Sequence, residues 1–448
     1  PRLSISKADA PLARTALGTL RGTAEDGVQV FRGVPYATAA RFQAPLPVAA
    51  WNGERAADRH GPIAPQLPSR LAQVMGGFDR PQGEDCLSLT VWTQAADQGR
   101  RPVLVWIHGG AHQYGAGSSS LYQANALVEK GVVLVTINYR LGAFGYLAHP
   151  ALTEEAGTSG NYGLLEQAAA LVWVRDNIAA FGGDPGNVTL FGESAGAQSI
   201  SELMALPAAD GLYHKVILQS GASTGNMLHL KRSPVPGVLS AEDAGAEFLS
   251  VLAPKAATAK DLRAIPAAAI VSRADARSDL NGYFLPVVDG SVMPRTIGAA
   301  FRDGDVPSVP MLAGYNADEG TLFYDSFQSP TVLRAQITGS LAEREAALAE
   351  VFGRNPAKAL QALYGMDTIE TWDKGATDML GDDLFGVHMR FIARQNAQSG
   401  APTYLYQFTR VPPSRNQTIG AYHAAEISFV FDSHLPLVKL NESDRKLT

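Results

Sequence analysis

The sequence predicts an α/β fold built on a mostly parallel sheet, and two observations carry that prediction. Strand-like and helix-like segments alternate along the first half of the chain. The strand-like segments are nearly continuous in apolar residues, as expected of strands that helices cover on both faces. Alternation of strands and helices is typical of parallel sheets, because a helical crossover returns the chain to the end where the next strand begins.

The expected elements follow one another in a regular order. Apolar and β-branched runs predict strands at 102–107, 132–138, 188–191, 215–219, 309–313 and 403–408. Helix formers predict helices between the early strands at 124–130 and 164–180.

Two longer segments rich in helix formers, 241–274 and 341–363, separate the later strands. We expect them within insertions at about 223–305 and about 325–400 that pack over the carboxyl edge of the sheet, where α/β folds bind ligands. No flexible linker, low-complexity tract or internal repeat marks a boundary. Residues 1–448 are therefore predicted to form a single domain.

The composition excludes several classes of function. Of the 448 residues, 46% are hydrophobic and 18% are charged, and the formal net charge is -6. Acidic and basic residues are interspersed, so no basic patch for nucleic acid or for a membrane surface is predicted. The longest apolar run, 168–174, is far shorter than the ~20 residues that a transmembrane helix needs. We expect a soluble protein with no nucleic-acid partner.

Cysteine content and the first residue bear on the compartment. Cys86 is the only cysteine, which excludes an intrachain disulfide. The chain begins with Pro1 rather than Met, so an N-terminal segment can have been removed. The first residues therefore do not decide between a cytoplasmic and an exported protein. Neither composition nor charge predicts an oligomeric state.

Two stretches read Gly-x-Ser-x-Gly, one around Ser194 and one around Ser223. The first follows a predicted strand and precedes the helix-forming residues 197–206, which predicts a strand-turn-helix elbow with an exposed hydroxyl. The second precedes residues 226–236, where two prolines and the lack of an apolar period predict a loop. An elbow is the geometry that a nucleophilic serine needs, so Ser194 is the candidate nucleophile.

A nucleophilic serine needs an imidazole that accepts its proton and a carboxylate that orients the imidazole. The histidines that lie well beyond Ser194 are His229, His388, His423 and His434. His423 is favoured because a single loop separates it from the predicted strand 403–408, where a C-terminal strand would deliver the imidazole.

The carboxylate is expected directly after the predicted strand 309–313, because the acid precedes the histidine in sheets of this kind. Asp318 and Glu319 are adjacent there and cannot both point at one imidazole. Spacing alone does not choose between them, and we expect the other to be a solvated turn residue.

Backbone donors for an oxyanion are expected after the strand 102–107. Gly109 and Gly110 let N–H groups approach a substrate, and Ala195 supplies another N–H after the nucleophile. Gly-rich loops also bind phosphates, but the sequence has no Gly-x-x-x-x-Gly-Lys-Ser/Thr motif, and no lysine follows these glycines. The expected chemistry requires neither a metal ion nor an organic cofactor.

Further ordered motifs occur along most of the chain. They include Gly18-Thr19-Leu20-Arg21-Gly22, Phe31-Arg32-Gly33-Val34-Pro35, Glu84-Asp85-Cys86-Leu87, Asn138-Tyr139-Arg140-Leu141-Gly142, Phe181-Gly182-Gly183-Asp184-Pro185, Gln219-Ser220-Gly221-Ala222, Asp318-Glu319-Gly320 and His423-Ala424-Ala425-Glu426-Ile427. In this order they resemble type-B carboxylesterases, the group that includes bacterial para-nitrobenzyl esterases and the cholinesterases. So many ordered motifs make a chance match implausible.

The resemblance implies an α/β-hydrolase fold and hydrolysis of small carboxylic esters through an acyl-enzyme intermediate. It implies a triad of Ser194, Glu319 and His423, and thereby selects Glu319 over Asp318. It implies oxyanion donors at the backbone of Gly110, Ala111 and Ala195. It further implies a buried polar shell of Glu193, Ser220 and Glu426 behind the triad, and a structural ion pair between Arg41 and Glu84.

The sequence also departs from the family pattern. Ala64 occupies the place of the cysteine that would pair with Cys86, which suits bacterial relatives better than vertebrate ones. Cholinesterases have a tryptophan shortly before the Glu84-Asp85-Cys86 motif, whereas no tryptophan lies between Trp51 and Trp92 here. Choline esters are therefore not expected to be preferred, because this cation–π platform is missing. The sequence stops at 441–448, whereas family members usually continue for several tens of residues with a tryptophan-bearing helix. The C-terminal family segment is thus apparently absent; either the sequence is truncated or the C-terminal packing differs.

Two rival functions follow from the same resemblance. The family contains adhesion proteins that kept the fold and lost the nucleophile, and the intact set of Ser194, Glu319 and His423 argues against such a binding role. Amidases and lactonases use the same triad, and the shape of the acyl pocket decides between them and esterases.

Overall fold

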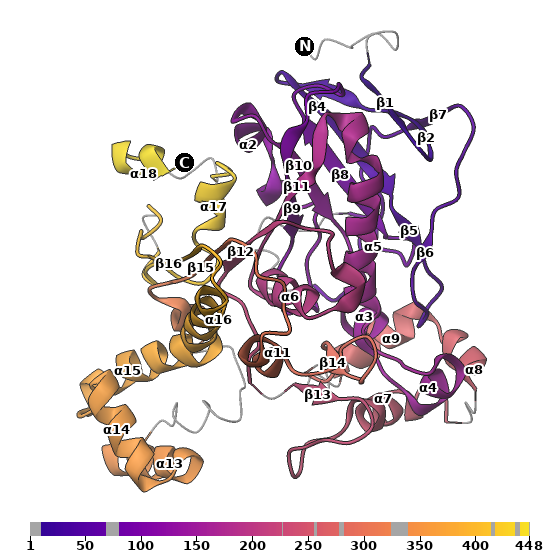
Figure 1. Cartoon of the computed structure of the whole chain (residues 1–448). Coiled ribbons are helices and arrows are strands. Elements are labelled where there is room, and N and C mark those ends of the chain that lie inside the picture. The colour runs from indigo at the N-terminus through magenta and orange to yellow at the C-terminus, as the bar shows by residue number, and fades with distance from the viewer. Residues whose placement is uncertain are drawn as a thin grey trace.

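A nine-stranded sheet forms the centre of the protein (Figure 1), in a computed structural model that describes residues 10–68, 80–225, 227–254, 258–276, 282–323, 339–413, 417–434 and 440–447. In spatial order its strands are β16 (Thr403–Phe408), β15 (Met311–Asn316), β12 (Lys215–Gln219), β11 (Gly183–Glu193), β9 (Arg101–Ile107), β10 (Val133–Ile137), β8 (Ser88–Thr93), β4 (Val28–Pro35) and β3 (Thr23–Glu25). From β16 to β10 all neighbours are parallel, and β8, β4 and β3 add an antiparallel edge. The mostly parallel α/β sheet that the sequence predicts is confirmed.

Shorter strands lie outside the central sheet. They are β1 (Leu12–Thr15), β2 (Gly18–Arg21) and β7 (Glu54–Ala56) in one small sheet, the pair β5 (Ala37–Thr38) and β6 (Leu46–Pro47), and the pair β13 (Leu228–His229) and β14 (Val287–Val288).

Helices separate the strands along the chain. Up to β12 they are α2 (Asn125–Glu129), α3 (Gly142–Tyr146), α4 (Pro150–Ala156), α5 (Tyr162–Asn177) and α6 (Ala195–Met204). The later ones are α7 (Ala241–Ser250), α8 (Ala259–Arg263), α9 (Ala267–Ala276), α11 (Ile297–Asp303), α13 (Leu341–Phe352), α14 (Arg354–Tyr364), α15 (Ile369–Gly381), α16 (Val387–Gln398), α17 (Ile427–Val430) and α18 (Glu442–Leu447). Among the described residues, no helix is long and apolar enough to cross a membrane.

Strand β9 shows why both faces of the sheet are apolar. Successive side chains of a strand point to opposite faces. Val105 and Ile107 pack into the core on the side of α5 and α6, whereas Trp106 packs with Tyr122, Phe191 and Phe431 on the other side. A strand buried on both faces must be apolar at every position, which explains the continuous apolar runs in the sequence.

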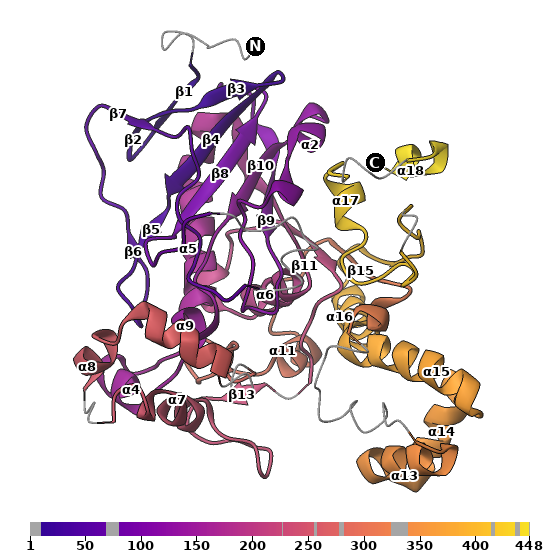
Figure 2. The ribbon, with the colours of Figure 1, turned by 180° about the vertical axis from the view of Figure 1, so that it is seen from behind.

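The two groups of later helices lie at the end of the sheet where the parallel strands finish. In Figures 1 and 2, α7–α9 and α13–α15 form separate groups beyond α6, and α6 begins where β11 ends. Helix α16 falls within the range expected for the second insertion, and it packs against β15 and β16. Residues 324–338, at the start of that insertion, lie outside the described residues.

Several boundaries differ from the expected ones for physical reasons. The strand expected at 309–313 is β15, Met311–Asn316, because pairing with β16 continues to the polar residue Asn316. The expected loop at 226–236 contains β13, which gains its hydrogen bonds from β14, a segment far along the chain. The antiparallel edge formed by β8, β4 and β3 was not expected, and a register shift between Phe31 and Val34 interrupts its pattern.

Candidate active site

Ser194 lies in a sharp turn between β11 and α6. Its φ of 56° and ψ of -125° lie in a region that a residue with a side chain rarely occupies. Its backbone N–H donates to the carbonyl of Gln219 at 2.8 Å, which ties the turn to the next strand. Ser194 is partly exposed, whereas its neighbours Glu193 and Ala195 are buried. The turn therefore presents the hydroxyl to solvent from an otherwise buried strand end.

Glycine at position 196 allows this turn to form against β9. A Cβ atom there would lie 2.0 Å from the carbonyl oxygen of Ile107, which is closer than any real contact. Only glycine lets α6 begin this close to the neighbouring strand. This explains why a glycine follows the serine by two residues.

The loop after β9 has three consecutive residues with positive φ: Gly110 at 111°, Ala111 at 55° and His112 at 57°. Successive residues in this region form a concave backbone whose N–H groups can bind an anion. Within the described residues, no backbone hydrogen bond uses the N–H of Gly110, Ala111 or Ala195. Ala195 is the first residue of α6, where N–H groups have no partner inside the helix. These donors remain available for a ligand.

Glu319 and His423 meet although 104 residues separate them in sequence. The Nδ1 atom of His423 lies 2.6 Å from Oε2 of Glu319, and the other carboxylate oxygen, Oε1, accepts the N–H of Asn316 at 2.7 Å. Both side chains are buried. Because Nδ1 donates to the carboxylate, Nε2 of a neutral imidazole is the free acceptor.

The Nε2 atom of His423 lies next to Glu193, the residue that precedes Ser194. It lies 3.0 Å from Oε1 of Glu193, an oxygen that forms no hydrogen bond in the described part of the chain. The imidazole is stacked on Phe385, with ring centroids 4.3 Å apart, and Phe323 contacts it at 5.0 Å. Phe385 belongs to the π-helical segment Asp382–Gly386 between α15 and α16.

Buried carboxylates determine the ionisation of this imidazole. Burial raises the pKa of Glu193 to about 8, the facing His423 opposes that rise, and Glu426 and Glu319 add to it. Burial by itself would lower the pKa of His423, but Glu193 and Glu319 outweigh it and raise that pKa to about 9. Burial also raises the pKa of Glu426. Glu193 and Glu319 thus favour the protonated ring, and the ionisation of Glu193 is coupled to that of His423.

Two residues that sequence reasoning missed complete the polar shell around this set. Asn316 donates through Nδ2 to Oε2 of Glu426 at 2.6 Å, and Gln219 donates through Nε2 to the other carboxylate oxygen at 3.0 Å. Ser220, also expected in the shell, is fully buried, and its hydroxyl has no partner among the described residues. Asn316 and Gln219 are the last residues of β15 and β12. A polar residue at the carboxyl end of an apolar strand was the signal that could have revealed them.

The carboxylate beside the acid lies in a turn, as expected, but it is not simply solvated. Asp318 is partly buried, and its Oδ2 accepts the backbone N–H of Ala421 at 2.7 Å. Asp318 and Glu319 point to different groups because a 3₁₀ turn, Glu319–Leu322, starts between them. Each carboxylate therefore contacts the segment that carries His423.

The other candidates lie elsewhere. Ser223 is in a loop after β12, and the next hydroxyl, that of Thr224, lies 2.6 Å from Nδ1 of His388. His434 packs edge-on against Phe429. Arg41 and Glu84 form the ion pair that the resemblance implied, with Arg41 Nε 2.7 Å from Glu84 Oε2. Cys86 is buried and free.

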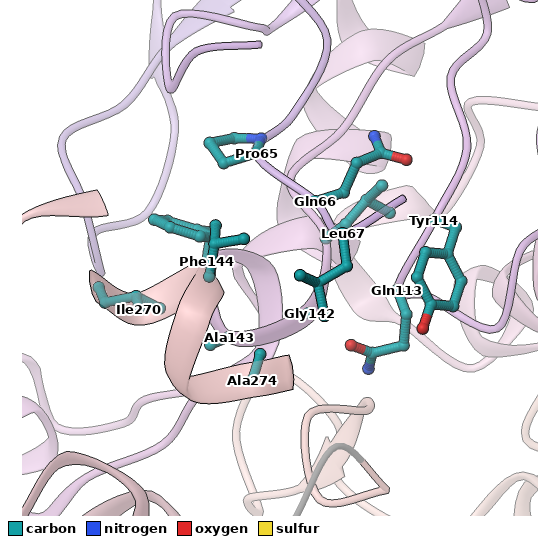
Figure 3. Close-up of a pocket in the computed structure, with 12 residues that line it drawn as sticks. Pro65, Gln66, Leu67, Gln113, Tyr114, Gly142, Ala143, Phe144, Ile270 and Ala274 are labelled. Carbon is teal, nitrogen blue, oxygen red and sulfur yellow. The ribbon is translucent and has the colours of Figure 1, made fainter. Parts of the chain in front are cut away.

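A small pocket lies beside the positive-φ loop rather than at Ser194 (Figure 3). Its walls include Gln66, Gln113, Tyr114, Phe144 and Ile270, and none of its lining residues is charged. Its volume of about 30 Å³ is room for about two water molecules. Within the described ranges, no group of three or more His, Cys, Asp or Glu side chains is arranged to hold a metal ion.

Known esterases resemble this chain in sequence. A family model described as "Carboxylesterase family" matches residues 9–448. The chain is 38% identical over 434 residues to a para-nitrobenzyl esterase of Bacillus subtilis, covering 94% of this chain and 82% of that protein. It is 35% identical over 430 residues to a fumonisin B1 esterase of Sphingopyxis macrogoltabida, covering 93% and 74%.

Solved structures agree with the sequence relatives. A PNB esterase structure superposes with a TM-score of 0.82 at 35% identity, covering 98% of this chain and 88% of that one. A carboxylesterase of Geobacillus stearothermophilus superposes with a TM-score of 0.80 at 34% identity, covering 97% and 87%. These proteins share the α/β-hydrolase fold.

Proposed function

The chain belongs to the carboxylesterase family, and we propose that Ser194, His423 and Glu319 carry out its ester hydrolysis. It is a serine hydrolase that cleaves carboxylic esters of small molecules. The observation that most supports the assignment is the buried contact of 2.6 Å between His423 and Glu319. This contact orients an imidazole whose free nitrogen lies beside the residue that precedes Ser194.

In the proposed mechanism, the hydroxyl of Ser194 attacks the ester carbonyl while Nε2 of His423 accepts its proton. Nε2 first turns from Oε1 of Glu193 to the hydroxyl, since catalytic hydrogen bonds often close only in the substrate complex. Glu319 holds the ring by Nδ1 and stabilises the imidazolium that forms. The imidazolium then protonates the leaving alcohol, and water hydrolyses the acyl-enzyme by the same steps.

We assign the oxyanion hole to the N–H groups of Gly110, Ala111 and Ala195. The support is that these three donors have no backbone acceptor within the described residues and come from one positive-φ loop and one helix start. Donors fixed before the reaction stabilise the charge that develops on the carbonyl oxygen without having to reorganise. The side chains at these positions are too small to obstruct the approach.

Glu193 and Glu426 are proposed to set the proton affinity of the imidazole, and Ser220 to belong to the same shell. His423 must be neutral to accept the proton of Ser194 at Nε2. The imidazolium that then forms is stabilised by the nearby Glu193 when that carboxylate is ionised. The buried shell thus favours the charged state of the ring that the reaction generates.

Covalent labelling tests the nucleophile directly. A phosphonylating inhibitor should react with Ser194, and peptide mapping of the digested adduct should find the label there. Ser194→Ala should abolish labelling, and the matched variant Ser223→Ala should keep it. An adduct on Ser223 would overturn the assignment.

A further inference from the structure

Two loops bring Glu319 and His423 together. We call residues 316–322, which begin at the last residue of β15, the acid loop. We call residues 417–423, which lie after β16 in the chain and end at His423, the histidine loop. Strand pairing continues past the end of β15, because Ala317 donates its N–H to the carbonyl of Phe408, the last residue of β16, at 2.8 Å. The acid loop therefore starts beside the end of β16. Further contacts must fix its position relative to the histidine loop, which begins nine residues after Phe408.

Asp318 forms two hydrogen bonds with the histidine loop, one as donor and one as acceptor. Its backbone N–H donates to the carbonyl of Ala421 at 3.0 Å, and its Oδ2 accepts the N–H of Ala421 at 2.7 Å. Ala421 precedes His423 by two residues and is fully buried. A reciprocal pair of bonds to one residue fixes both the separation and the direction of the loop at that point.

Neighbouring side chains of the acid loop hold the same segment. The hydroxyl of Thr321 lies 2.8 Å from the carbonyl of Ile419, and Nδ2 of Asn316 donates to the carbonyl of Tyr422 at 2.7 Å. Three side chains of the acid loop thus contact residues on both sides of Ala421. Of the three, Asp318 is the one that accepts rather than donates.

Gly420 makes room for this contact. Its φ is 70°, and a Cβ atom at this position would lie 2.2 Å from Oδ2 of Asp318. A side chain here would both strain the backbone and push the carboxylate away from the Ala421 N–H. Gly420 and Asp318 therefore pack closely against each other where the two loops meet.

We propose that Asp318 is a positioning residue, which sets the place of the His423 imidazole by clamping the histidine loop to the acid loop. This inference rests on the proposed function, because it acts through the imidazole assigned as the base. Asp318 acts here as a hydrogen-bond acceptor, and the oxygen of an asparagine accepts the same N–H. Its role is thus distinct from that of Glu319, where an amide would also present the wrong group to the imidazole.

The test measures hydrolysis of 4-nitrophenyl acetate by Asp318→Ala, Asp318→Asn and Ser194→Ala. Asp318→Ala should lower kcat by about 10- to 100-fold with little change in KM, since a displacement of ~1 Å can reduce a rate by ~100-fold. Asp318→Asn should restore most of that loss. A matched control is Asp378→Ala, which removes a carboxylate of α15 whose partner is the exposed Lys374.

A pH profile separates positioning from a loss of stability. If Asp318→Ala loosens the contact between His423 and Glu319, the acid limb of kcat/KM moves to lower pH, because that contact raises the pKa of the ring. A variant that is only less stable keeps the wild-type limb. Gly420→Ala tests the same contact from the other loop and should lower kcat, so the proposal stays testable if Asp318→Ala does not fold.

The outcomes distinguish the inference from the proposed function. Wild-type kcat in Asp318→Ala, or in Gly420→Ala if only that variant folds, would overturn the clamp while an inactive Ser194→Ala leaves the proposed function in place. If Asp318→Asn and Asp318→Ala lose kcat equally, the charge of Asp318 matters rather than its hydrogen bond from the Ala421 N–H. That result would also overturn the clamp. An active Ser194→Ala would overturn the proposed function, and the clamp with it.

Discussion

The proposed nucleophile and the proposed acid–imidazole pair are held in different ways. Ser194 is fixed by the backbone, in a strained turn between β11 and α6 that close contacts at glycine allow. Glu319 and His423 lie on loops, and side-chain hydrogen bonds between those loops bring them together. The first arrangement depends on neighbours in sequence, whereas the second depends on residues about a hundred positions apart.

This difference teaches which changes each region tolerates. A strained backbone turn stays in place only because the surrounding strands determine it, so replacing the serine side chain should leave the turn intact. A loop held by polar side chains loses its position when one acceptor is removed. Replacing the Ser194 side chain should therefore affect chemistry alone, whereas replacing a polar side chain that holds the loops should affect geometry as well.

The largest expected effect is at the backbone-held region. Ser194→Ala should reduce kcat by about 10⁶-fold, as loss of a serine nucleophile does elsewhere. Its thermal transition should stay close to that of the parent, because the turn is fixed by backbone contacts. Turnover and thermal unfolding of the same preparation check both parts, with Ser223→Ala as a control that keeps most activity. A large fall in thermal stability would mean that the hydroxyl itself holds the elbow.

The next effect is at the loop-held region. Glu319→Gln should lower kcat by about 10⁴-fold, because an amide no longer selects the imidazole tautomer with its free nitrogen toward the serine. The matched change Asp318→Asn should be mild by comparison. Steady-state kinetics of the two variants provide the measurement. The reverse order of losses would show that the acid had been assigned to the wrong residue.

The same contrast explains how much could be predicted from the sequence. The elbow was readable because strand, turn and helix signals are adjacent, and the predicted strands 215–219 and 403–408 match β12 and β16 at both ends. The choice of Glu319 over Asp318 came from the family resemblance rather than from spacing. Their distinct roles depend on contacts with the histidine loop, which is distant in sequence.

Other features could not be predicted from the sequence, because they depend on contacts between residues that are far apart in it. The antiparallel edge of β8, β4 and β3 depends on pairing across the sheet and contains a register shift. The contact between Nε2 of His423 and Glu193 is visible only when the loop and the end of β11 are placed together. Phe385 stacks on the imidazole from a π-helical segment that the helical pattern of the sequence does not distinguish from α-helix.

A smaller effect, on pH dependence, is expected where the two regions meet. The charge of Glu193 raises the pKa of His423, so removing that charge in Glu193→Gln should lower it. The neutral, active form of the base then persists to lower pH, and the acid limb of kcat/KM moves in that direction. The loss of turnover should be smaller than that of Glu319→Gln.

Glu202→Gln is the matched control for that shift. Glu202 is also buried, its pKa is raised to about 8 by burial, and its described partner is Gln198 rather than the imidazole. The acid limb of the kcat/KM profile of Glu202→Gln should lie at the same pH as that of the wild type. A limb that moves equally in both variants would show that general burial, rather than the contact with Glu193, sets the pKa of the base.

The smallest expected effect concerns the alcohol part of the substrate. A desolvated cation–π contact contributes ~2 kcal/mol or more, which is roughly thirtyfold in kcat/KM. No tryptophan lies between Trp51 and Trp92, and the pocket beside the positive-φ loop has no charged side chain. We therefore expect a neutral ester, with carbon in place of the quaternary nitrogen of a choline ester, to be hydrolysed at least as efficiently as the cation.

The two esters should be compared at high ionic strength, because the net charge of -6 attracts a cation over long range and salt screens that attraction. A bias that disappears with salt is then electrostatic steering. A preference for the cation of about tenfold or more that persists would approach the cation–π magnitude. It would mean that an aromatic side chain such as Tyr114, which lines the pocket, supplies the platform that the missing tryptophan supplies in cholinesterases.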